Sequence, residues 1–214
     1  MPYRLALFDF DGTLADSLDW FLDVFDDVAD RFGFRRLDPG DRERLRGLDA
    51  RTILRDRGIP LWKLPRIARH MRDLGARADI RPFPGVPSLL AELTAGGVAV
   101  VVVTSNAESN VRRVLGPAAA HVARFACGAS LFGKAAKIRA VLRATGADPR
   151  TALLIGDEAR DVEAARDAGI DCAAVAWGYA DPAFLRSLQP TVFFERITDV
   201  APLLLGQATT KPLA

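Results

Sequence analysis

A short apolar run followed by two acidic residues constrains the fold of this chain more than any other feature. The segment from Leu5 to Asp16 has the sequence LALFDFDGTLAD. Its apolar beginning predicts a strand that is buried on both faces, as the strands of parallel sheets are. Asp9 and Asp11 follow where this strand should end, and ligands of open α/β sheets bind at that edge of the sheet. We therefore expect both carboxylates to lie in a binding cleft.

The close spacing of these two acids indicates a bound cation. Two carboxylates one residue apart repel each other unless a cation or a proton compensates their charge. Mg²⁺ prefers such oxygen ligands and completes its shell with water and substrate phosphate. One Asp can then attack phosphorus as a nucleophile while the other serves as general acid and base. Gly12 allows a sharp turn, which would place free backbone N–H groups of Gly12 and Thr13 beside the acids, where they can bind phosphate.

This segment resembles motif I, DxDGT, of the haloacid dehalogenase superfamily of phosphotransferases. The resemblance implies that Asp9 is the nucleophile and a metal ligand. It also implies that Asp11 is the general acid and base and reaches the metal through its backbone carbonyl. The dehalogenases that give the superfamily its name lack the second Asp of the motif, so Asp11 favours phosphoryl transfer over dehalogenation. Taken alone, the motif could also be an acidic surface turn after a strand.

A second polar cluster follows the apolar run VAVVVV, which begins at Val98. Thr104, Ser105 and Asn106 stand where this strand should end, ahead of a predicted helix. Hydroxyl, amide and backbone N–H groups at such a position can hold a phosphate. The cluster resembles motif II of the family, with Thr104 favoured, Ser105 as the alternative and Asn106 as a substrate contact. A simple helix cap is the other interpretation.

The segment TALLIGDEARD places Asp157 after another apolar run and Asp161 four residues later. If a helix begins near Glu158, Asp161 lies within its first turn, and both Asp side chains can face one cation. The segment resembles motif IV, GDxxxD. The resemblance implies that Asp157 binds Mg²⁺ directly and that Asp161 orients the site or binds through water, with Glu158 as a weaker candidate. Acids at a helix start can also simply complement the helix dipole.

Lysine is rare in this Arg-rich chain, and two of its four Lys stand together in FGKAAK. A compact ammonium group fits a crowded pocket of carboxylate and phosphate better than a guanidinium fork does. Lys134 lies 23 residues before Asp157, a spacing typical of family members that resemble phosphoglycolate phosphatase. We favour Lys134 as motif III, the lysine that neutralises the nucleophile and the phosphate. Lys137 could fill this role with a shifted helix start.

Helical periodicity dominates the segment between the first two motifs. Apolar spacing predicts helices over Ser17–Phe32, Asp41–Leu48, Ala50–Arg57 and Leu61–Gly75. No strand pattern interrupts them, so an inserted helical domain is expected. It corresponds to the small helical C1 cap of the family. We assign residues 16–82 to this cap and residues 1–15 and 83–214 to the core.

Helices and strands alternate after a Pro-rich return over residues 82–87. The predicted helices are Val86–Ala95, Ser109–Leu115, Lys134–Thr145 and Ala159–Ala168, and the predicted strands are Val98–Val103, Val122–Ala126, Ala152–Ile155 and Cys172–Val175. A final helix, strand and helix are expected around Phe184, Val192–Phe194 and Val200–Leu205. The alternation predicts an α/β fold with a doubly wound parallel sheet. The resemblance makes this the Rossmann-like core of the superfamily.

The composition is that of an ordinary soluble protein, with 50% hydrophobic residues in a chain of 214. The apolar run from Val98 to Val103 is too short to span a bilayer, and no signal-like segment precedes the first strand. We expect a cytoplasmic protein without a membrane partner, as a monomer or a homodimer. Cys127 and Cys172 are expected to be reduced, buried small residues, because a chain of this size needs no disulfide.

Positive charge gathers in the predicted cap. Residues 31–81 contain 15 Lys and Arg against 7 Asp and Glu, whereas the whole chain has a net charge of +2. A basic cap above an acidic metal site can steer anionic substrates, which favours an ester with a second anionic group. Solvated helix faces of an Arg-rich chain would explain the same charge. No basic run is interleaved with aromatic residues, so no nucleic-acid partner is expected.

The four motifs together predict a Mg²⁺-dependent phosphatase that hydrolyses a small phosphorylated metabolite through an aspartyl-phosphate. The resemblance favours a phosphoglycolate-like phosphate monoester as the substrate. A phosphomutase has the same active site and is the first alternative, and a regulatory or binding module without turnover is the second. The sequence assigns no role to His70, His121, Trp62, Trp177 and Tyr179.

Overall fold

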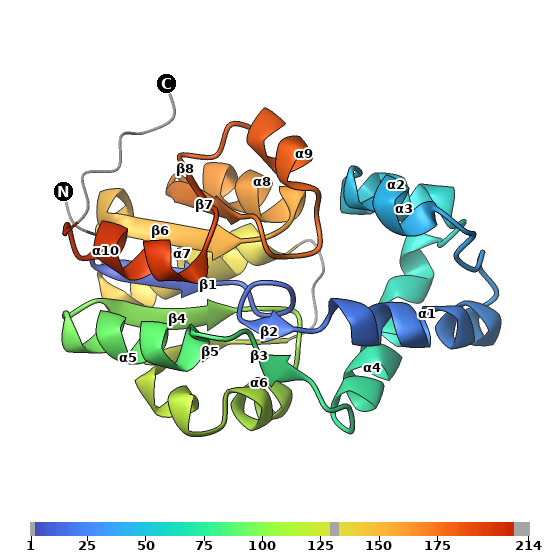
Figure 1. The fold of residues 1–214 in the computed structure, drawn as a ribbon, viewed down its shortest axis with the longest axis horizontal. Helices are drawn as coiled ribbons and strands as arrows, with labels where there is room; N and C mark the ends of the chain where they lie inside the picture. The colour runs from blue at the N-terminus through green and yellow to red at the C-terminus, as the bar shows by residue number, and fades with distance from the viewer. Residues whose placement is uncertain (1–2, 129–132, 208–214) are drawn as a thin grey trace.

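β1 (Leu5–Phe8) lies in the middle of a six-stranded parallel sheet in the computed structural model, which describes residues 3–128 and 133–207 (Figure 1). The strand order is β5-β4-β1-β6-β7-β8. The other strands are β4 (Ala99–Val103), β5 (Arg124–Ala126), β6 (Ala152–Gly156), β7 (Asp171–Val175) and β8 (Val192–Phe194). The chain extends the sheet from β1 to β5 and then crosses to the other side of β1, so the order reverses between β1 and β6. The predicted α/β class with a doubly wound parallel sheet is confirmed.

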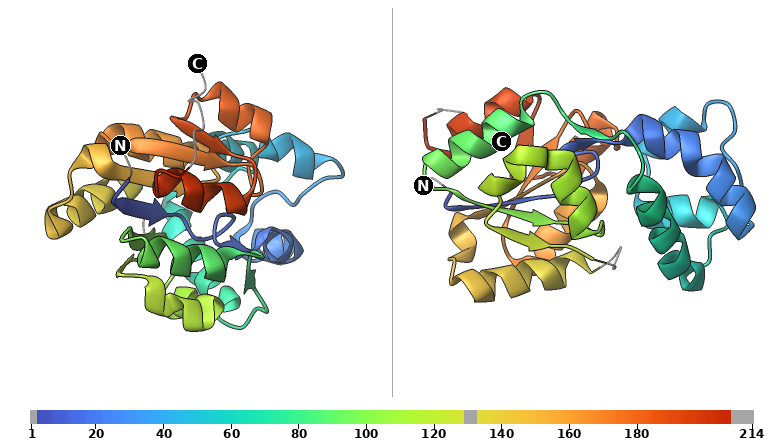
Figure 2. Two further views of the ribbon diagram at one scale, coloured as in Figure 1. Left: turned by 60° about the vertical axis from the view of Figure 1, so that its left-hand side comes forward. Right: turned by 90° about the horizontal axis from the view of Figure 1, so that it is seen from below.

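Helices cover both faces of this sheet (Figures 1 and 2). One layer contains α5 (Val86–Ala95), α6 (Glu108–Leu115) and α10 (Val200–Leu204), and the other contains α7 (Lys134–Thr145) and α8 (Ala159–Ala168). The residues of β1 alternate between the two cores: Ala6 and Phe8 pack into the first, Leu5 and Leu7 into the second. Because both faces are buried, the whole strand is apolar. Further out, α9 (Pro182–Ser187) buries Leu185 in a small cluster with Ala174 of β7.

Four helices gather beyond the sheet, on the side toward which the arrows of β4 and β6 point (Figure 1). They are α1 (Leu18–Phe32), α2 (Asp41–Arg46), α3 (Ala50–Asp56) and α4 (Leu64–Gly75). At the two ends of this helical segment, β2 (Ala15–Asp16) and β3 (Arg81–Pro82) form a short antiparallel pair. The division of the chain into a core and a cap of residues 16–82 stays a prediction.

Local boundaries differ from the predictions at a few places. The helix expected over Leu61–Gly75 begins as a 3₁₀ helix over Leu61–Lys63, and α4 then starts with Pro65 in its first turn, where the missing N–H costs nothing. The helix expected to reach Leu48 ends at Arg46, where Gly47 follows. The sequence does not predict β2 and β3, because strands of two residues leave no periodic signal. Further 3₁₀ helices cover Gly116–His121, Pro149–Thr151 and Ile197–Asp199.

Two expectations from the composition can be compared with the structure. Within the described ranges, no helix combines the length and apolarity needed to cross a membrane. Cys127 and Cys172 are free thiols, as predicted. The predicted burial is confirmed for Cys172 but wrong for Cys127, which is half-buried. Burial raises the pKa of Cys127 to about 11, so this thiol stays protonated at neutral pH.

Candidate active site

The carboxyl ends of three neighbouring strands bring the predicted site residues together. Asp9 follows β1, Thr104 follows β4 and Asp157 follows β6. Lys134 is the first residue of α7, and Asp161 lies in the first turn of α8. The site therefore lies where the strand order reverses, which is the place where open α/β sheets bind ligands.

Asp9 is 2% exposed, and its two carboxylate oxygens have different surroundings. Oδ1 accepts a hydrogen bond of 2.8 Å from the backbone N–H of Phe10. Oδ2 lies 2.8 Å from Nζ of Lys134 but accepts no aligned hydrogen bond from any described residue. A buried carboxylate oxygen beside a cation, with its lone pairs free, is available to a metal ion or to an electrophile.

The loop after Asp9 turns sharply at Gly12. Gly12 has a φ of +78°, and a Cβ at this position would lie 2.1 Å from Oδ2 of Asp157. An L side chain is therefore disfavoured by the backbone and excluded by the neighbouring carboxylate. The sequence predicts free N–H groups at Gly12 and Thr13. In the structure these groups donate within the loop instead, to the carbonyl oxygens of Ala15 at 2.9 Å and Phe10 at 3.2 Å.

Asp11 is half-buried and accepts hydrogen bonds from two side chains. Its Oδ2 accepts one of 3.1 Å from Nδ2 of Asn106, and its Oδ1 accepts one of 3.3 Å from the hydroxyl of Ser17. The Ser17 hydroxyl in turn lies 2.8 Å from that of Tyr179. Burial and the negative charge of Asp9 raise the pKa of Asp11 to about 6. A carboxyl group with this pKa can give and take a proton near neutral pH.

Asp157 is fully buried, and both of its oxygens have donors. Oδ1 accepts a hydrogen bond of 2.7 Å from the hydroxyl of Thr13, and Oδ2 accepts one of 2.8 Å from the backbone N–H of Tyr179. Burial and the negative charges of Glu158 and Asp9 raise the pKa of Asp157 well above its usual range. In its ionised form, Asp157 therefore needs compensating positive charge nearby.

Lys134 is buried between two carboxylates. Its Nζ lies 2.8 Å from Oδ2 of Asp9 and also donates to Oδ1 of Asp161. Burial alone would lower the pKa of Lys134, but the negative charges of Asp161 and Asp9 raise it above its usual value. Asp161 also accepts a hydrogen bond of 3.1 Å from the N–H of Glu158, within a capping box at the start of α8. Asp161 thus fixes the ammonium group that lies against Asp9.

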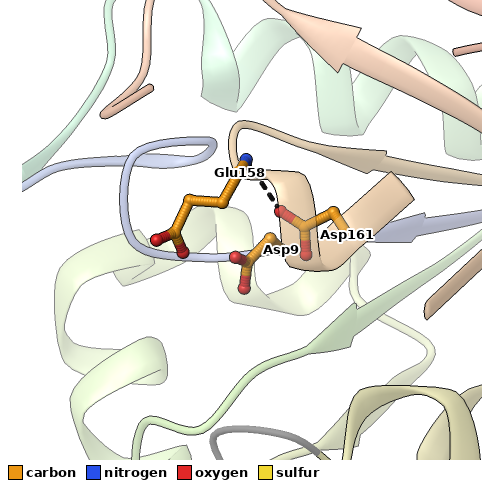
Figure 3. A group of neighbouring side chains, drawn as sticks. All are labelled: Asp9, Glu158 and Asp161. Carbon is orange, nitrogen blue, oxygen red and sulfur yellow. Dashed lines mark hydrogen bonds between the residues drawn. The ribbon is translucent and has the colours of Figure 1, made fainter. Parts of the chain in front are cut away.

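Oxygen ligands for a metal ion gather at the same edge. Carboxylate oxygens of Asp9, Glu158 and Asp161 lie within 4.8 Å of one another (Figure 3). The sequence predicts Asp9, Asp11 and Asp157 as ligands, with Glu158 as a weaker candidate. The group contains Asp9 and Glu158 but neither Asp11 nor Asp157. Burial raises the pKa of Asp161 to about 6, even beside Lys134. Oxygen donors and an excess of negative charge fit Mg²⁺.

A small pocket lies beside Asp9. It is lined by Asp9, Val103, Thr104, Ser105, Lys134, Lys137 and Arg160. Thr104 is 2% exposed, and its hydroxyl oxygen accepts a hydrogen bond of 3.0 Å from the N–H of Asn106. Nζ of Lys137 donates to the backbone carbonyls of Thr104, at 2.6 Å, and Gly128. Lys137 therefore holds the loops at the strand ends, whereas Lys134 contacts the carboxylate of Asp9.

Comparison with known proteins shows the family to which this chain belongs. The model of the haloacid dehalogenase-like hydrolases matches residues 6–175, which include the candidate residues from Asp9 to Asp161. The chain belongs to the haloacid dehalogenase-like hydrolases. The resemblance stated from the sequence motifs is confirmed.

Individual relatives of this haloacid dehalogenase-like hydrolase cover nearly its whole length. A phosphoglycolate phosphatase from Synechococcus elongatus is 32% identical over 201 residues, which are 92% of this chain and 95% of that protein. The tyrosine-protein kinase PtkA of Mycobacterium tuberculosis is 30% identical over 200 residues, which are 88% of this chain and 67% of PtkA. A predicted phosphatase from Clostridium acetobutylicum, known from its crystal structure, has a TM-score of 0.81 at 19% identity and covers 96% of this chain and 100% of its own. At this identity, the structural likeness shows the fold alone.

Three residues that sequence reasoning missed reach the site of this haloacid dehalogenase-like hydrolase. Arg160 lines the pocket and forms an ion pair with Glu158. Ser17 donates to Asp11, and Tyr179 contacts Ser17. Arg160 lies inside the fourth motif, so its position in GDEARD was a signal that could have identified it. Ser17 and Tyr179 carry no comparable signal, because only the fold brings them to Asp11.

The other residues without a predicted role have local contacts. Trp177 donates from Nε1 to the backbone carbonyl of Thr13 at 3.1 Å and so supports the loop after β1. The ring of His70 packs against that of Phe32, with 5.6 Å between the centroids. Trp62 is 69% exposed.

Proposed function

We propose that the protein is a Mg²⁺-dependent phosphatase of small phosphate monoesters that forms an aspartyl-phosphate on Asp9. The observation that carries this proposal concerns Oδ2 of Asp9. This oxygen is buried, lies 2.8 Å from Nζ of Lys134 and accepts no aligned hydrogen bond from a described residue. Such an oxygen can approach phosphorus without first losing a hydrogen bond to the protein. Membership in a hydrolase family and a relative named phosphoglycolate phosphatase support the same class of reaction.

In the first half-reaction, Oδ2 of Asp9 attacks phosphorus, and the bond between phosphorus and the ester oxygen breaks. Asp11, with a pKa of about 6, gives its proton to the leaving alkoxide, which departs as an alcohol. Lys134 and Thr104 line the pocket and stabilise the negative charge of the transferring oxygens. Asn106 and Ser17 hold the Asp11 carboxyl group by hydrogen bonds during this step.

In the second half-reaction, the Asp11 carboxylate takes a proton from a water molecule. The water oxygen attacks phosphorus, the bond between phosphorus and Asp9 breaks, and inorganic phosphate is released. Asp11 is then protonated again and Asp9 is again a free carboxylate, so the cycle is closed.

The carboxylates that would hold Mg²⁺ come from β1 and from the segment after β6. We propose Asp9 and Asp157 as direct ligands, as the sequence predicts, together with the backbone carbonyl of Asp11. The grouping of oxygens supports Glu158, the weaker candidate from the sequence, as a further ligand, whereas Asp161 is bound to Lys134 and positions it. When bound, the cation neutralises charge between the carboxylates and the phosphoryl oxygens, so that an anionic nucleophile can approach an anionic ester.

Residues 16–82 are proposed as a cap that covers the site. Nε of Arg46 in α2 donates to the backbone carbonyl of Tyr179 at 2.9 Å, and the N–H of Asp181 donates to the carbonyl of Arg46 at 2.8 Å. The helical segment therefore contacts the same loop that holds Asp157 through the Tyr179 N–H. A cap in contact with this loop would exclude bulk water during phosphoryl transfer.

The test is the hydrolysis of a panel of small phosphate esters by the wild type and by Asp9→Asn, with Mg²⁺ and with a chelator. We expect turnover that needs both the metal and Asp9, with a loss of at least about 1,000-fold in Asp9→Asn. Rapid quenching followed by mass spectrometry should detect a phosphoryl group on Asp9. Asp23→Asn, which changes an exposed acid of α1, is the matched control and should keep full activity.

Several outcomes would contradict the proposal. Equal activity of Asp9→Asn and the wild type would exclude Asp9 as the nucleophile. Turnover only in the presence of an added bisphosphate would indicate a phosphomutase. Binding of an acidic partner or of nucleic acid without any hydrolysis would indicate a module without turnover.

A further inference from the structure

Arg72, near the end of α4, has a buried donor without a partner. Among the described residues, the buried side-chain atoms that lack a hydrogen-bond partner are Nη1 of Arg72 and Oδ2 of Asp9. By contrast, the fully buried guanidinium of Arg57 is engaged: its Nη1 donates to Asp41 at 2.7 Å and to the carbonyl of Arg36 at 2.6 Å. A buried cationic donor without a partner is costly, and an anionic ligand would satisfy it.

Hydrogen bonds connect the backbone of Arg72 to the catalytic acid. The carbonyl of Arg72 accepts a hydrogen bond of 3.0 Å from Nδ2 of Asn110, which also donates to Oδ1 of Asn106 at 3.0 Å. Nδ2 of Asn106 donates to Oδ2 of Asp11 at 3.1 Å. Two side chains therefore separate the backbone of Arg72 from the residue proposed to protonate the leaving group.

A second set of contacts fixes the end of α4 in this place. Arg113 of α6 donates from Nη2 to the carbonyl of Gly75 at 2.7 Å and from Nη1 to the carbonyl of Ala78 at 3.0 Å. The carbonyl of Arg72 is thus one of three on this segment that are held by α6. Because α6 follows directly on Thr104 and Asn106, Arg72 is positioned relative to the pocket and not only within the helical segment.

The positive charge of Arg72 acts on Lys137, a residue that lines the pocket. Burial lowers the pKa of Lys137, and the positive charges of Lys134 and Arg72 contribute in the same direction. Lys137 and Lys134 both line the pocket beside Asp9. The guanidinium of Arg72 therefore adds to the positive charge that acts on Lys137, and an anion would balance this charge.

We propose that Arg72 binds a second anionic group of the substrate while the phosphate to be transferred lies against Asp9 and Lys134. A guanidinium presents a planar fork of donors that suits a carboxylate or a second phosphate. The substrate is then a small ester with two anionic ends, the second of which contacts the helical segment. This inference rests on the proposed phosphatase function and names the substrate class of the same site.

The test compares two esters that differ in one charged group, phosphoglycolate and ethyl phosphate. In Arg72→Gln, kcat/KM for phosphoglycolate should fall about 10- to 100-fold, mainly through KM, because a charge-assisted contact is lost. For ethyl phosphate, kcat/KM should stay within about twofold, since this ester makes no such contact. A small bisphosphate ester forms a third arm. A larger loss for the bisphosphate than for phosphoglycolate would assign the second group as a phosphate, and the reverse as a carboxylate.

Matched variants separate this contact from general effects. Arg69→Gln removes the same charge from an exposed position on α4. It should change kcat/KM for both esters alike, by less than about threefold. Arg72→Lys keeps the charge and should recover part of the selectivity, and circular dichroism should show that all three variants are folded. Equal losses of Arg72→Gln on phosphoglycolate and ethyl phosphate would overturn the inference, as would no loss on either.

Calorimetric binding of phosphoglycolate without metal tests Arg72 independently of turnover. Weaker binding to Arg72→Gln, with unchanged binding of inorganic phosphate, is expected. If the wild type hydrolyses no ester but binds phosphoglycolate through Arg72, the proposed function fails and the anion site stands. If the wild type hydrolyses esters and Arg72→Gln keeps the wild-type preference, the anion site fails and the phosphatase stands. If the wild type shows neither turnover of esters nor binding of phosphoglycolate, both the proposed function and the anion site fail.

Discussion

The hydroxyl of Thr13 donates a hydrogen bond of 2.7 Å to the buried carboxylate of Asp157, although 144 positions separate the two residues in the chain. The bond joins the loop after β1 to the end of β6 across the point where the strand order reverses. It leaves Asp157 with a donor on each oxygen, because the Tyr179 N–H occupies the other. The first and fourth motifs therefore form one structural unit.

Loss of the Thr13 hydroxyl should weaken this unit. In Thr13→Val, one oxygen of Asp157 loses its buried donor, which should lower the free energy of unfolding by about 1–3 kcal/mol. Mg²⁺ affinity should fall about 10- to 100-fold, as is usual when a partner of a metal ligand is removed. Activity measured against Mg²⁺ concentration and a thermal melt report the two effects. Thr13→Ser keeps the donor, so a Ser variant as impaired as Val would contradict this explanation.

A side chain at position 12 should disturb the site more than the fold. Gly12→Ala places a Cβ 2.1 Å from Oδ2 of Asp157, and φ is +78°. A displacement of the carboxylate by this contact should reduce kcat by about 100-fold. Gly97→Ala is the control, because Gly97 has a φ of +79° and a Cβ there meets nothing within 4 Å. Backbone strain should lower the free energy of unfolding of both variants by about 1–2 kcal/mol, but only Gly12→Ala should lose activity. Similar activities of the two would argue against crowding at Asp157.

Mg²⁺ should stabilise the folded protein. The carboxylates of Asp9, Glu158 and Asp161 lie within 4.8 Å of one another, and their repulsion is relieved by a cation. At a concentration of Mg²⁺ 100-fold above Kd, linkage gives about 2.7 kcal/mol, which raises Tm by about 5–10 °C for a chain of this size. Calorimetry with Mg²⁺ and with chelator measures the shift. Glu158→Gln should reduce it, whereas Glu92→Gln on α5 should not; a full shift in Glu158→Gln would remove Glu158 from the ligand set.

The stability of the helical segment should depend on pH through Asp41. A hydrogen bond from the N–H of Asp38, followed by those from Arg44 and Arg57, lowers the pKa of Asp41 to about 2. The folded pKa lies below the unfolded value of about 3.9, so the stabilisation is fully present above pH 5 and is lost as the pH falls from 4 toward 2. Thermal melts should therefore show a lower Tm for Asp41→Asn than for wild type at pH 7, and the gap should narrow at pH 3.

Asp23→Asn is the control for the pH series, because Asp23 is an exposed acid on α1. Its Tm should follow that of the wild type at every pH. A gap between Asp41→Asn and the wild type that stays constant from pH 7 to pH 3 would show that the stabilisation does not come from the ionised carboxylate.

Much of the fold and part of the site could be predicted from the sequence for a common reason. The strands β1, β4 and β6 are buried on both faces, so each is a continuous apolar run, and the polar residue after each run marks the strand end. Asp9, Thr104 and Asp157 were identifiable in this way, since parallel neighbours end at one edge. The roles proposed for these residues stay predictions.

Other parts of the site depended on side-chain geometry that periodicity does not contain. Lys134 and Lys137 lie about one turn apart on α7, and the direction of each side chain decides that one contacts Asp9 while the other holds the carbonyl of Thr104. The N–H groups of Gly12 and Thr13 were expected to be free, but the loop satisfies them internally because its carbonyls lie within reach.

The sequence by itself determined the family, the parallel sheet and the acids at its carboxyl edge, because these follow from local apolar runs and short motifs. Only the tertiary structure decided which distant side chains complete the site. The hydroxyl of Ser17 meets that of Tyr179 across 162 positions. The backbone carbonyl of Arg72 is held by Asn110 of α6, while Nη1 of the same residue is buried without a partner. The physical reason is that hydrogen bonding and burial of a single polar side chain depend on what the packing of separate elements places around it, and no local pattern records that arrangement.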